Sequence, residues 1–139
     1  MTIGIDFDGT CVTYEFPAIG KDIGAVHILR QLTDQGHKLI LFTMRSDITA
    51  PESNDVNIVL QGGNYLTDAI NWFNDNNIPL YGIQTNPTQH TWTTSPKAYC
   101  DLYIDDAALG CPLIHIAHAR PHVDWLKVKQ ILYDKQILQ

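Results

Sequence analysis

The chain has few cysteines: Cys11, Cys100 and Cys111 are the only ones among 139 residues. Their number is odd and their spacing is irregular, which argues against a disulfide framework. No secretory leader is apparent at the start, and no apolar run approaches the ~18 residues that a membrane-spanning helix needs. We therefore expect a soluble protein of the reducing cytoplasm, without a membrane partner.

Basic residues are also scarce. Nine Lys and Arg face 15 Asp and Glu, which gives a formal net charge of −6. An acidic surface disfavours nucleic acid as a partner, because Lys and Arg supply most of the non-specific affinity for its phosphates. A small anionic substrate is still compatible with this charge, since a few placed cations and a bound metal can dominate the field inside a pocket.

No linker, repeat or low-complexity tract divides the chain, and its length and 45% hydrophobic content fit a single domain, residues 1–139. Short apolar runs alternate with amphipathic segments, a pattern typical of a parallel sheet covered by helices. We predict an α/β fold with a central, mostly parallel sheet of about five strands and helices on both faces.

The predicted elements follow from apolar periodicity and from Gly and Pro positions. Strands are expected at residues 3–5, 38–42, 80–83, 102–104 and, as a fifth, 112–116. Helices are expected at residues 23–35 (ended by Gly36), around 65–73, and from Pro121 onward with Val123, Leu126, Ile131 and Leu132 on its apolar face. Residues 11–21 and 44–63 are predicted loops, the second with a short strand at 56–60.

Three predicted strands end at polar residues: Asp6, Thr43 and Asp105. Ligands of open parallel sheets bind outside the carboxyl ends of the strands, near a topological switch point. We therefore expect these three residues to meet at one edge of the sheet. Carboxylates gathered there would repel one another, so a divalent cation is their natural companion.

The segment Asp6-Phe7-Asp8-Gly9-Thr10 has a suitable internal geometry for catalysis. Strand side chains alternate, so Asp6 and Asp8 can point toward the same side. One carboxylate can then remain ionised as a nucleophile while the other handles protons. Gly9 permits a close turn whose amide groups can face phosphate oxygens. The competing interpretation is that these acids only cap a turn.

These residues resemble the haloacid dehalogenase (HAD) superfamily of phosphotransferases. Asp6-Phe7-Asp8-Gly9-Thr10 looks like its first motif, Thr43 after Leu39-Ile40-Leu41-Phe42 is similar to its second, Lys97 stands in the place of its third, and Asp105-Asp106 stands in the place of its fourth. The resemblance runs from residue 3 to about residue 110. It implies a three-layer, Rossmann-like (HAD-like) fold, here without a separate cap domain.

The resemblance also implies a mechanism. Asp6 would attack phosphorus to give an aspartyl-phosphate, and Asp8 would protonate the leaving group and then activate water. Mg²⁺ would be held by Asp6, the Asp8 backbone carbonyl, Asp105 and, directly or through water, Asp106. The residues expected to bind phosphate or substrate are Gly9, Thr10, Thr43, Arg45 and Lys97. The expected activity is hydrolysis of a small phosphate monoester, such as a sugar phosphate or a nucleotide.

Several of these assignments have simpler rivals. Asp105-Asp106 could cap a turn, Thr43 could be an ordinary strand residue, and Lys97 could be a solvated surface lysine. Arg45 could contact substrate or pair with a nearby Asp. His115, His118 and His122 match no common zinc spacing and are expected to be structural or surface residues.

Other functions also fit parts of the sequence. Without a cap, the site would accept bulky substrates unless residues 44–63 or a neighbouring subunit of a homo-oligomer closed it. A phosphatase acting on polynucleotide ends is therefore an alternative, as is a catalytically silent phosphate-binding module. A signalling receiver domain would need an acid after its third strand, where this chain has Gln84.

Overall fold

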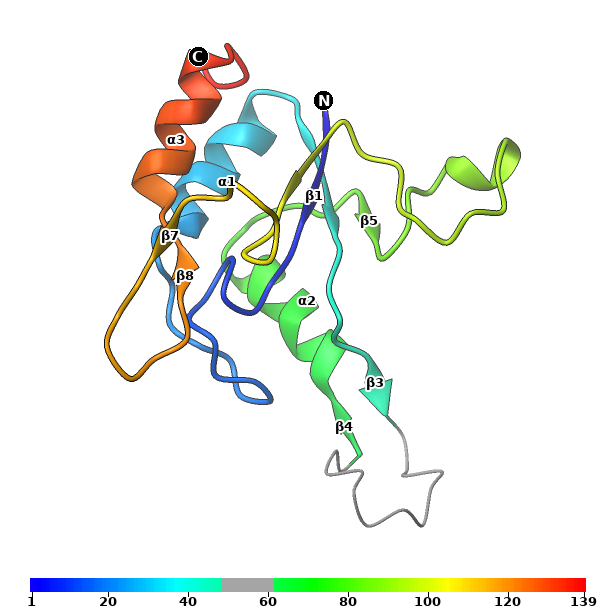
Figure 1. Ribbon diagram of the computed structural model, residues 1–139. Helices are drawn as coiled ribbons and strands as arrows, with labels where there is room; N and C mark the ends of the chain where they lie inside the picture. Colours follow the sequence, from blue (N-terminus) through cyan, green and yellow to red (C-terminus); the bar gives the residue numbers. More distant parts are fainter. Residues whose placement is uncertain (49–61) are drawn as a thin grey trace.

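The computed structural model describes residues 1–48 and 62–139 (Figure 1). At its centre is a parallel sheet of four strands: β1 (Thr2–Ile5), β2 (Lys38–Leu41), β5 (Gly82–Ile83) and β6 (Leu102–Ile104). Their order across the sheet is β5-β2-β1-β6. β1 is thus an inner strand, and Ile3 pairs with Leu39 on one side and with Leu102 on the other. The structure is mixed α/β, as predicted, with four central strands rather than about five.

Three helices accompany the sheet: α1 (Ala25–Asp34), α2 (Tyr65–Asp75) and α3 (Trp125–Asp134). Each carries an apolar stripe at helical spacing; in α1 the buried residues are Ala25, Ile28, Leu29 and Leu32. Gly36 follows α1 with a φ of 87°, so the predicted left-handed residue at this helix end is confirmed.

All three helices pack against the same face of the sheet. Their buried residues form one core with Ile3, Ile5, Leu39 and Leu41, the alternate residues of β1 and β2. On the opposite face, Ile40 packs with Ala98 and Cys100, and Phe42, Tyr81 and Tyr103 lie around them. No helical residue of the described chain belongs to this second cluster, so the prediction of helices on both faces is wrong.

The direction of the crossovers explains this arrangement. The steps β1 to β2 and β2 to β5 move the same way across the sheet, so right-handed connections place α1 and α2 on one face. The step from β5 back to β6 runs the opposite way, and residues 84–101 consequently cross the other face. This connection forms only the short 3₁₀ helix η1 (Gln89–Thr91) and is ordered by the buried side chains of Asn86 and Gln89.

Two short antiparallel ribbons lie outside the sheet. The first joins β3 (Asp47–Ile48) to β4 (Gly63–Asn64), and the second joins β7 (Leu113–Ile114) to β8 (His122–Val123). β3 and β4 were not predicted, and the strand expected at residues 56–60 lies outside the described residues.

The second ribbon corrects two predictions. Residues 112–116 do not add a fifth strand to the sheet, because β7 pairs only with β8. The last helix also does not start at Pro121: Val123 is part of β8, and the side chain of Asp124 caps α3 by accepting a hydrogen bond from the Lys127 amide at 3.2 Å. The side-chain cap therefore fixes the start of the helix.

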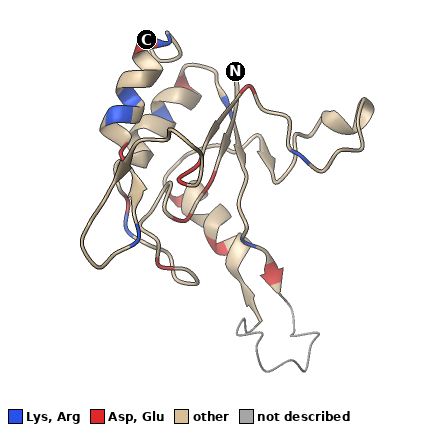
Figure 2. Ribbon diagram, in the orientation of Figure 1, with Lys and Arg blue, Asp and Glu red and all other residues tan. Residues whose placement is uncertain are grey.

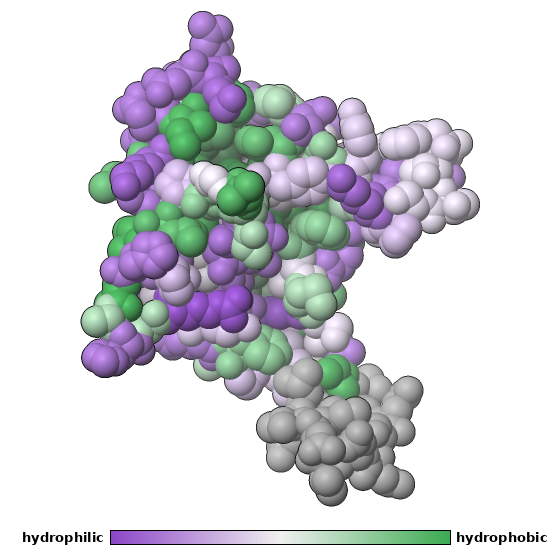
Figure 3. Space-filling view, in the orientation of Figure 1, coloured by the Kyte–Doolittle hydropathy of each residue, from purple (hydrophilic) through white to green (hydrophobic). Residues whose placement is uncertain are grey.

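The hydropathy of the surface differs between the two sides of the molecule in this view. In Figure 3, apolar side chains gather on the left, over α3 and the β7–β8 ribbon, whereas the projecting 84–98 segment on the right is covered mainly by residues of intermediate hydropathy. Leu126 on α3 is 82% exposed, and Trp92 in the projecting segment is 63% exposed. None of the described helices is both long and apolar enough to cross a bilayer.

Candidate active site

The acidic residues predicted to meet do so at the carboxyl ends of β1 and β6. Asp6 directly follows β1, and Asp105 directly follows β6. The chain proceeds from β1 toward β2 and β5 and then returns to β6 on the other side of β1, so these two neighbouring strands flank the switch point of the sheet. Figure 2 shows acidic segments in the loops that leave these strands.

Three carboxylates form a compact group there. One oxygen each from Asp6, Asp105 and Asp106 lies within 4.8 Å of the others, and this is the one such group of potential ligands among the described residues. Burial, reinforced by the charges of Asp105 and Asp106, raises the pKa of Asp6 from 3.8 to about 7. Burial also raises the pKa of Asp106, with Asp105 adding to the effect. An oxygen-only group under this mutual repulsion suits a hard divalent cation.

Thr10 connects the two loops of the acidic group. Its buried hydroxyl donates to Asp6 Oδ2 at 2.8 Å and accepts from the Asp106 amide at 3.0 Å. The hydroxyl therefore fixes the plane of the Asp6 carboxylate and holds the loop after β6 against it. Although the sequence places Thr10 at the phosphate, the structure gives its side chain this supporting position.

Gly9 lies where the two loops approach most closely. Its φ is 78°, and a Cβ on it would stand 2.7 Å from Asp106 Oδ2, so neither the backbone conformation nor the space suits a side chain. Its carbonyl accepts from the Val123 amide at 2.9 Å, and the Thr10 carbonyl accepts from Trp125 Nε1 at 2.7 Å. The C-terminal quarter of the chain thus holds this loop from behind.

Gly9→Ala should lower the free energy of unfolding by about 1–3 kcal/mol and weaken divalent-cation binding, because it adds left-handed strain and displaces Asp106. Gly110→Ala is the matched control: Gly110 has a φ of 88° but nothing within 4 Å of the added Cβ. Chemical denaturation and cation titration would measure both effects. Equal losses of stability and cation affinity in the two variants would contradict the steric role of Gly9.

Asp8 does not join the acidic group through its side chain. Instead, Arg45 Nε donates to Asp8 Oδ2 at 2.7 Å and Arg45 Nη2 donates to Oδ1 at 2.8 Å. The guanidinium also donates to the carbonyls of Pro17, Ala18 and Tyr65. Arg45 is only 2% exposed. Of the two roles considered for Arg45, the structure shows the pairing with a nearby Asp. Substrate contact stays a prediction.

Thr43 lies at the same end of the sheet, after β2. Its hydroxyl accepts from the Arg45 amide at 3.1 Å, which leaves the hydroxyl proton to be donated. Gln84 brackets the segment: its side chain accepts from the Thr43 amide at 3.0 Å and donates to the carbonyls of Thr43 and Arg45. Thr43 therefore lies at the same end of the sheet as Asp6 and Asp105, and its contact with a phosphate stays a prediction.

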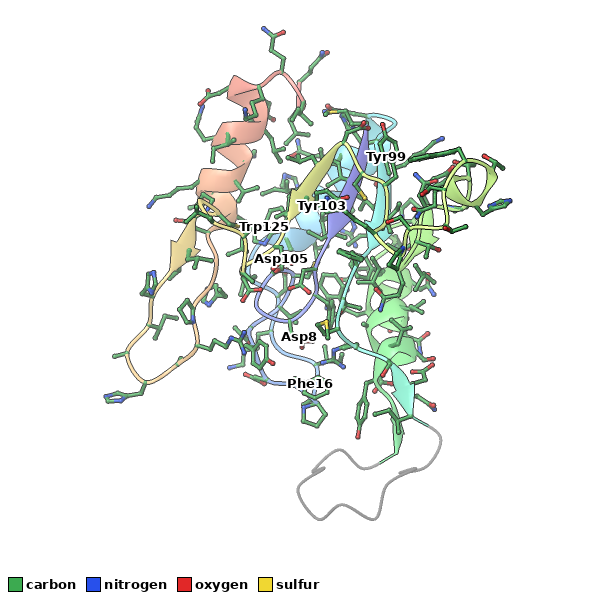
Figure 4. All side chains as sticks on the ribbon, turned by 45° about the vertical axis from the view of Figure 1, so that its right-hand side comes forward. Asp8, Phe16, Tyr99, Tyr103, Asp105 and Trp125 are labelled. Carbon is green, nitrogen blue, oxygen red and sulfur yellow. The ribbon has the colours of Figure 1, made fainter. Side chains whose placement is uncertain are left out.

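A pocket of about 390 Å³ opens over these groups. It is lined by Asp6, Asp8, Tyr14, Phe16, Thr43, Met44, Arg45, Asp105, Asp106, Ala107 and Arg120. In Figure 4, Asp105, Asp8 and Phe16 follow one another toward the bottom of the view, whereas Tyr103 and Tyr99 lie toward the opposite end.

Lys97 is not brought to this pocket. It is exposed, and its ammonium lies 5.5 Å from the centroid of the Tyr103 ring, on the sheet face without helices. Arg120 lines the pocket instead, with its Cζ 3.8 Å from the centroid of Tyr14. His115, His118 and His122 do not come together as a ligand group in the described chain.

Sequence reasoning missed several residues that build the site. Gln84 was noted only as a missing acid, and its φ of 63° and its double role on Thr43 have no sequence signal. Arg120 precedes Pro121 in a segment without a motif. Trp125 is 2% exposed, and its hydrogen bond to the Thr10 carbonyl depends on tertiary structure, so no local sequence pattern indicates it.

Comparison with known proteins shows similarity to a solved structure. No family model matches the chain, and no curated protein matches it. Among solved structures, a conserved protein from Bacteroides thetaiotaomicron is similar, with 31% sequence identity and a TM-score of 0.70 over 97% of this chain and 91% of the other. The chain therefore belongs to the same family as this conserved Bacteroides thetaiotaomicron protein.

Proposed function

We propose that this protein is a Mg²⁺-dependent phosphatase of the HAD type, with a Rossmann-like fold, that hydrolyses a phosphate monoester through an aspartyl-phosphate on Asp6. The observation that carries the proposal is the convergence of Asp6, Asp105 and Asp106 beside the switch point, with one carboxylate oxygen of each within 4.8 Å. These three residues would hold the metal. When bound, Mg²⁺ supplies charge neutralisation for the phosphoryl group.

The first step forms a bond from an Asp6 carboxylate oxygen to phosphorus and breaks the ester P–O bond. Thr10 supports this step because its hydrogen bond to Oδ2 fixes the orientation of the carboxylate. Thr43 faces the same pocket and has a hydroxyl proton to donate to a phosphoryl oxygen. Positioned donors of this kind act on charge that develops in the transition state.

Asp8 handles the protons in both steps. In the structure both Asp8 oxygens accept from Arg45, at 2.7 and 2.8 Å, so the first step requires a proton bound to one Asp8 oxygen in place of one of these hydrogen bonds. Asp8 gives this proton to the departing alkoxide and takes one from the water that attacks the aspartyl-phosphate, so the Asp6 carboxylate and the Asp8 acid are both regenerated and inorganic phosphate is released. Arg45 orients the Asp8 carboxyl toward the pocket that it lines. Arg45 is therefore a positioning residue in this mechanism.

The pocket accommodates a small substrate. Its volume of about 390 Å³ is in the range of ligand sites, and its outer wall includes the aromatic rings of Tyr14 and Phe16 from the loop at residues 11–21. No folded cap domain covers it within residues 1–48 and 62–139. We propose a small phosphorylated metabolite, such as a sugar phosphate or a nucleotide, as the substrate.

The test compares two leaving groups. The wild-type chain should hydrolyse both p-nitrophenyl phosphate and a sugar phosphate with Mg²⁺ and neither with EDTA. Asp8→Asn should slow sugar-phosphate hydrolysis by about 10²–10⁴-fold and p-nitrophenyl phosphate hydrolysis by less, because nitrophenolate leaves without a proton. A wild-type chain inert toward a broad monoester panel with Mg²⁺ or Mn²⁺ would end the proposal.

A further inference from the structure

The pocket is lined by two cations, and they differ in how much of their hydrogen-bonding capacity is used. Arg45 is committed to Asp8 and to three backbone carbonyls. Arg120 makes no hydrogen bond or ion pair with any described residue; its recorded contact is with the ring of Tyr14. Arg120 is therefore the pocket cation whose N–H donors are not used by the described residues.

The contact with Tyr14 gives Arg120 a defined place. Its Cζ lies 3.8 Å from the ring centroid, a distance at which the guanidinium rests on the ring face. The N–H donors of a guanidinium lie in its own plane, so a contact through the face leaves its edge open to a ligand. Tyr14 comes from the loop after β1 and Arg120 from the segment between β7 and β8, so the pair joins two loops at the wall of the pocket.

Arg120 also shares the pocket with the acidic group, because Asp6, Asp105, Asp106 and Arg120 all line it. The positive charge of Arg120 therefore borders the space in which a phosphoryl group would lie beside Asp6. Lys97 has no comparable position, because its ammonium lies over Tyr103 and Lys97 does not line the pocket.

We propose that Arg120, oriented by Tyr14, binds the non-bridging oxygens of the substrate's phosphoryl group and is the phosphate-binding cation of this site. A guanidinium edge matches two phosphoryl oxygens and forms charge-assisted hydrogen bonds to them. The inference deepens the proposed function and rests on it. It replaces Lys97, which the resemblance places in this role, by a residue outside the four motifs.

The experiment measures turnover and ligand binding separately. Turnover is followed with p-nitrophenyl phosphate and Mg²⁺, and inorganic phosphate binding by isothermal titration calorimetry. Arg120→Gln should lower kcat/KM by about 10²-fold and phosphate affinity by at least about tenfold, because a charged donor pair is lost. Arg120→Lys should recover part of both, since it restores the charge without the planar fork.

Tyr14 provides the test of orientation. Tyr14→Leu removes the ring under the guanidinium and should lower phosphate affinity several-fold, and Tyr14→Phe, which keeps the ring, should recover most of that affinity. Lys129→Gln is the matched control, because Lys129 is a cation 5.8 Å from the Tyr133 ring on α3, away from the pocket. Circular dichroism of each variant verifies that the fold is intact.

Two results would overturn the inference. One is an Arg120→Gln chain that keeps wild-type phosphate affinity; the other is a Lys97→Gln chain that carries the loss instead. In both cases, wild-type turnover leaves the proposed function standing. If the wild type hydrolyses no monoester, the proposed function fails, but the phosphate titration still tests the role of Arg120. Phosphate binding that Arg120→Gln weakens supports this role, and a wild type that does not bind phosphate refutes it.

Discussion

Asp6→Asn should abolish hydrolysis, by at least about 10³-fold, and at the same time make the metal-free chain more stable above pH 7. The loss of turnover follows because an amide cannot form the aspartyl-phosphate. The gain of stability follows because the carboxylate is buried beside two other acids, whereas an amide is neutral and can still accept the hydrogen bond that Thr10 donates at 2.8 Å. A charge that catalysis requires but that destabilises the fold is expected to show both effects: its neutral variant loses activity and gains stability.

The size of the stability effect follows from the shift in the pKa of Asp6. The pKa of Asp6 rises from 3.8 to about 7 on folding, first through burial and then through the charges of Asp105 and Asp106. Between these two values the folded chain holds a proton that the unfolded chain has released, so the free energy of unfolding falls as the pH rises through this window. Above pH 7 Asp6 is ionised in both states, and the buried carboxylate lowers the free energy of unfolding by its full amount, about 2–4 kcal/mol.

Urea denaturation in EDTA at pH 5 and pH 8 would measure this cost. The wild-type chain should lose stability between the two pH values, and Asp6→Asn should lose less by about the amount assigned to Asp6. Mg²⁺ should restore the wild type at pH 8, since a cation relieves the same repulsion. Asp75→Asn, an exposed change on α2, is the control. An identical pH response in wild type and Asp6→Asn would refute the electrostatic argument.

Arg45→Met should destabilise the chain by about 3–5 kcal/mol, because it leaves the buried Asp8 carboxylate without its partner. The guanidinium is also the donor for the carbonyls of Pro17, Ala18 and Tyr65, which tie the loop at residues 11–21 and the start of α2 to the site. Methionine has a similar length and can occupy the space between Phe7 and Phe16, whose ring centroids lie 5.1 and 5.0 Å from the guanidinium carbon. The loss is therefore electrostatic and polar rather than steric.

A double-mutant cycle isolates the ion pair. Asp8→Asn combined with Arg45→Met should be less destabilised than the sum of the single changes, since the uncompensated charge is removed. Arg30→Met is the matched control: Arg30 is exposed and donates one hydrogen bond to the Asn76 carbonyl, so its loss should cost under about 1 kcal/mol. Equal effects of the two Arg→Met changes in denaturant titrations would contradict the buried role of Arg45.

The parts of the fold that local sequence patterns determine were predictable. Apolar runs ending at Asp6 and Asp105 identified two adjacent strands, and Gly36 marked the end of α1. The helices on a single face were not predictable from these patterns, because they depend on the order of strands in the sheet. A strand was expected at residues 112–116, where β7 lies, but its pairing with β8 outside the sheet was not predictable, since the two-residue strand β8 has no measurable periodicity.

The same distinction holds for the site. The acids at strand ends were found because strand termini of a parallel sheet share an edge. Lys97 was expected at the site but does not line the pocket, because the connection at residues 84–101 carries it over Tyr103 on the other face of the sheet. Arg120, which lines the pocket, was not considered for the site. The sequence shows that Arg45 follows Thr43 by two residues, but its partners come from three other segments and become visible only in three dimensions.

The hydrogen bonds from Val123 to Gly9 and from Trp125 to Thr10 have a consequence for biosynthesis. During translation the two donors emerge more than a hundred residues after the acceptor carbonyls. Until then the loop that carries Asp6 and Asp8 lacks both hydrogen bonds, and it acquires them only when β8 and the first residue of α3 have docked against it. Contacts of such large sequence separation slow folding, because a large loop must close before they form.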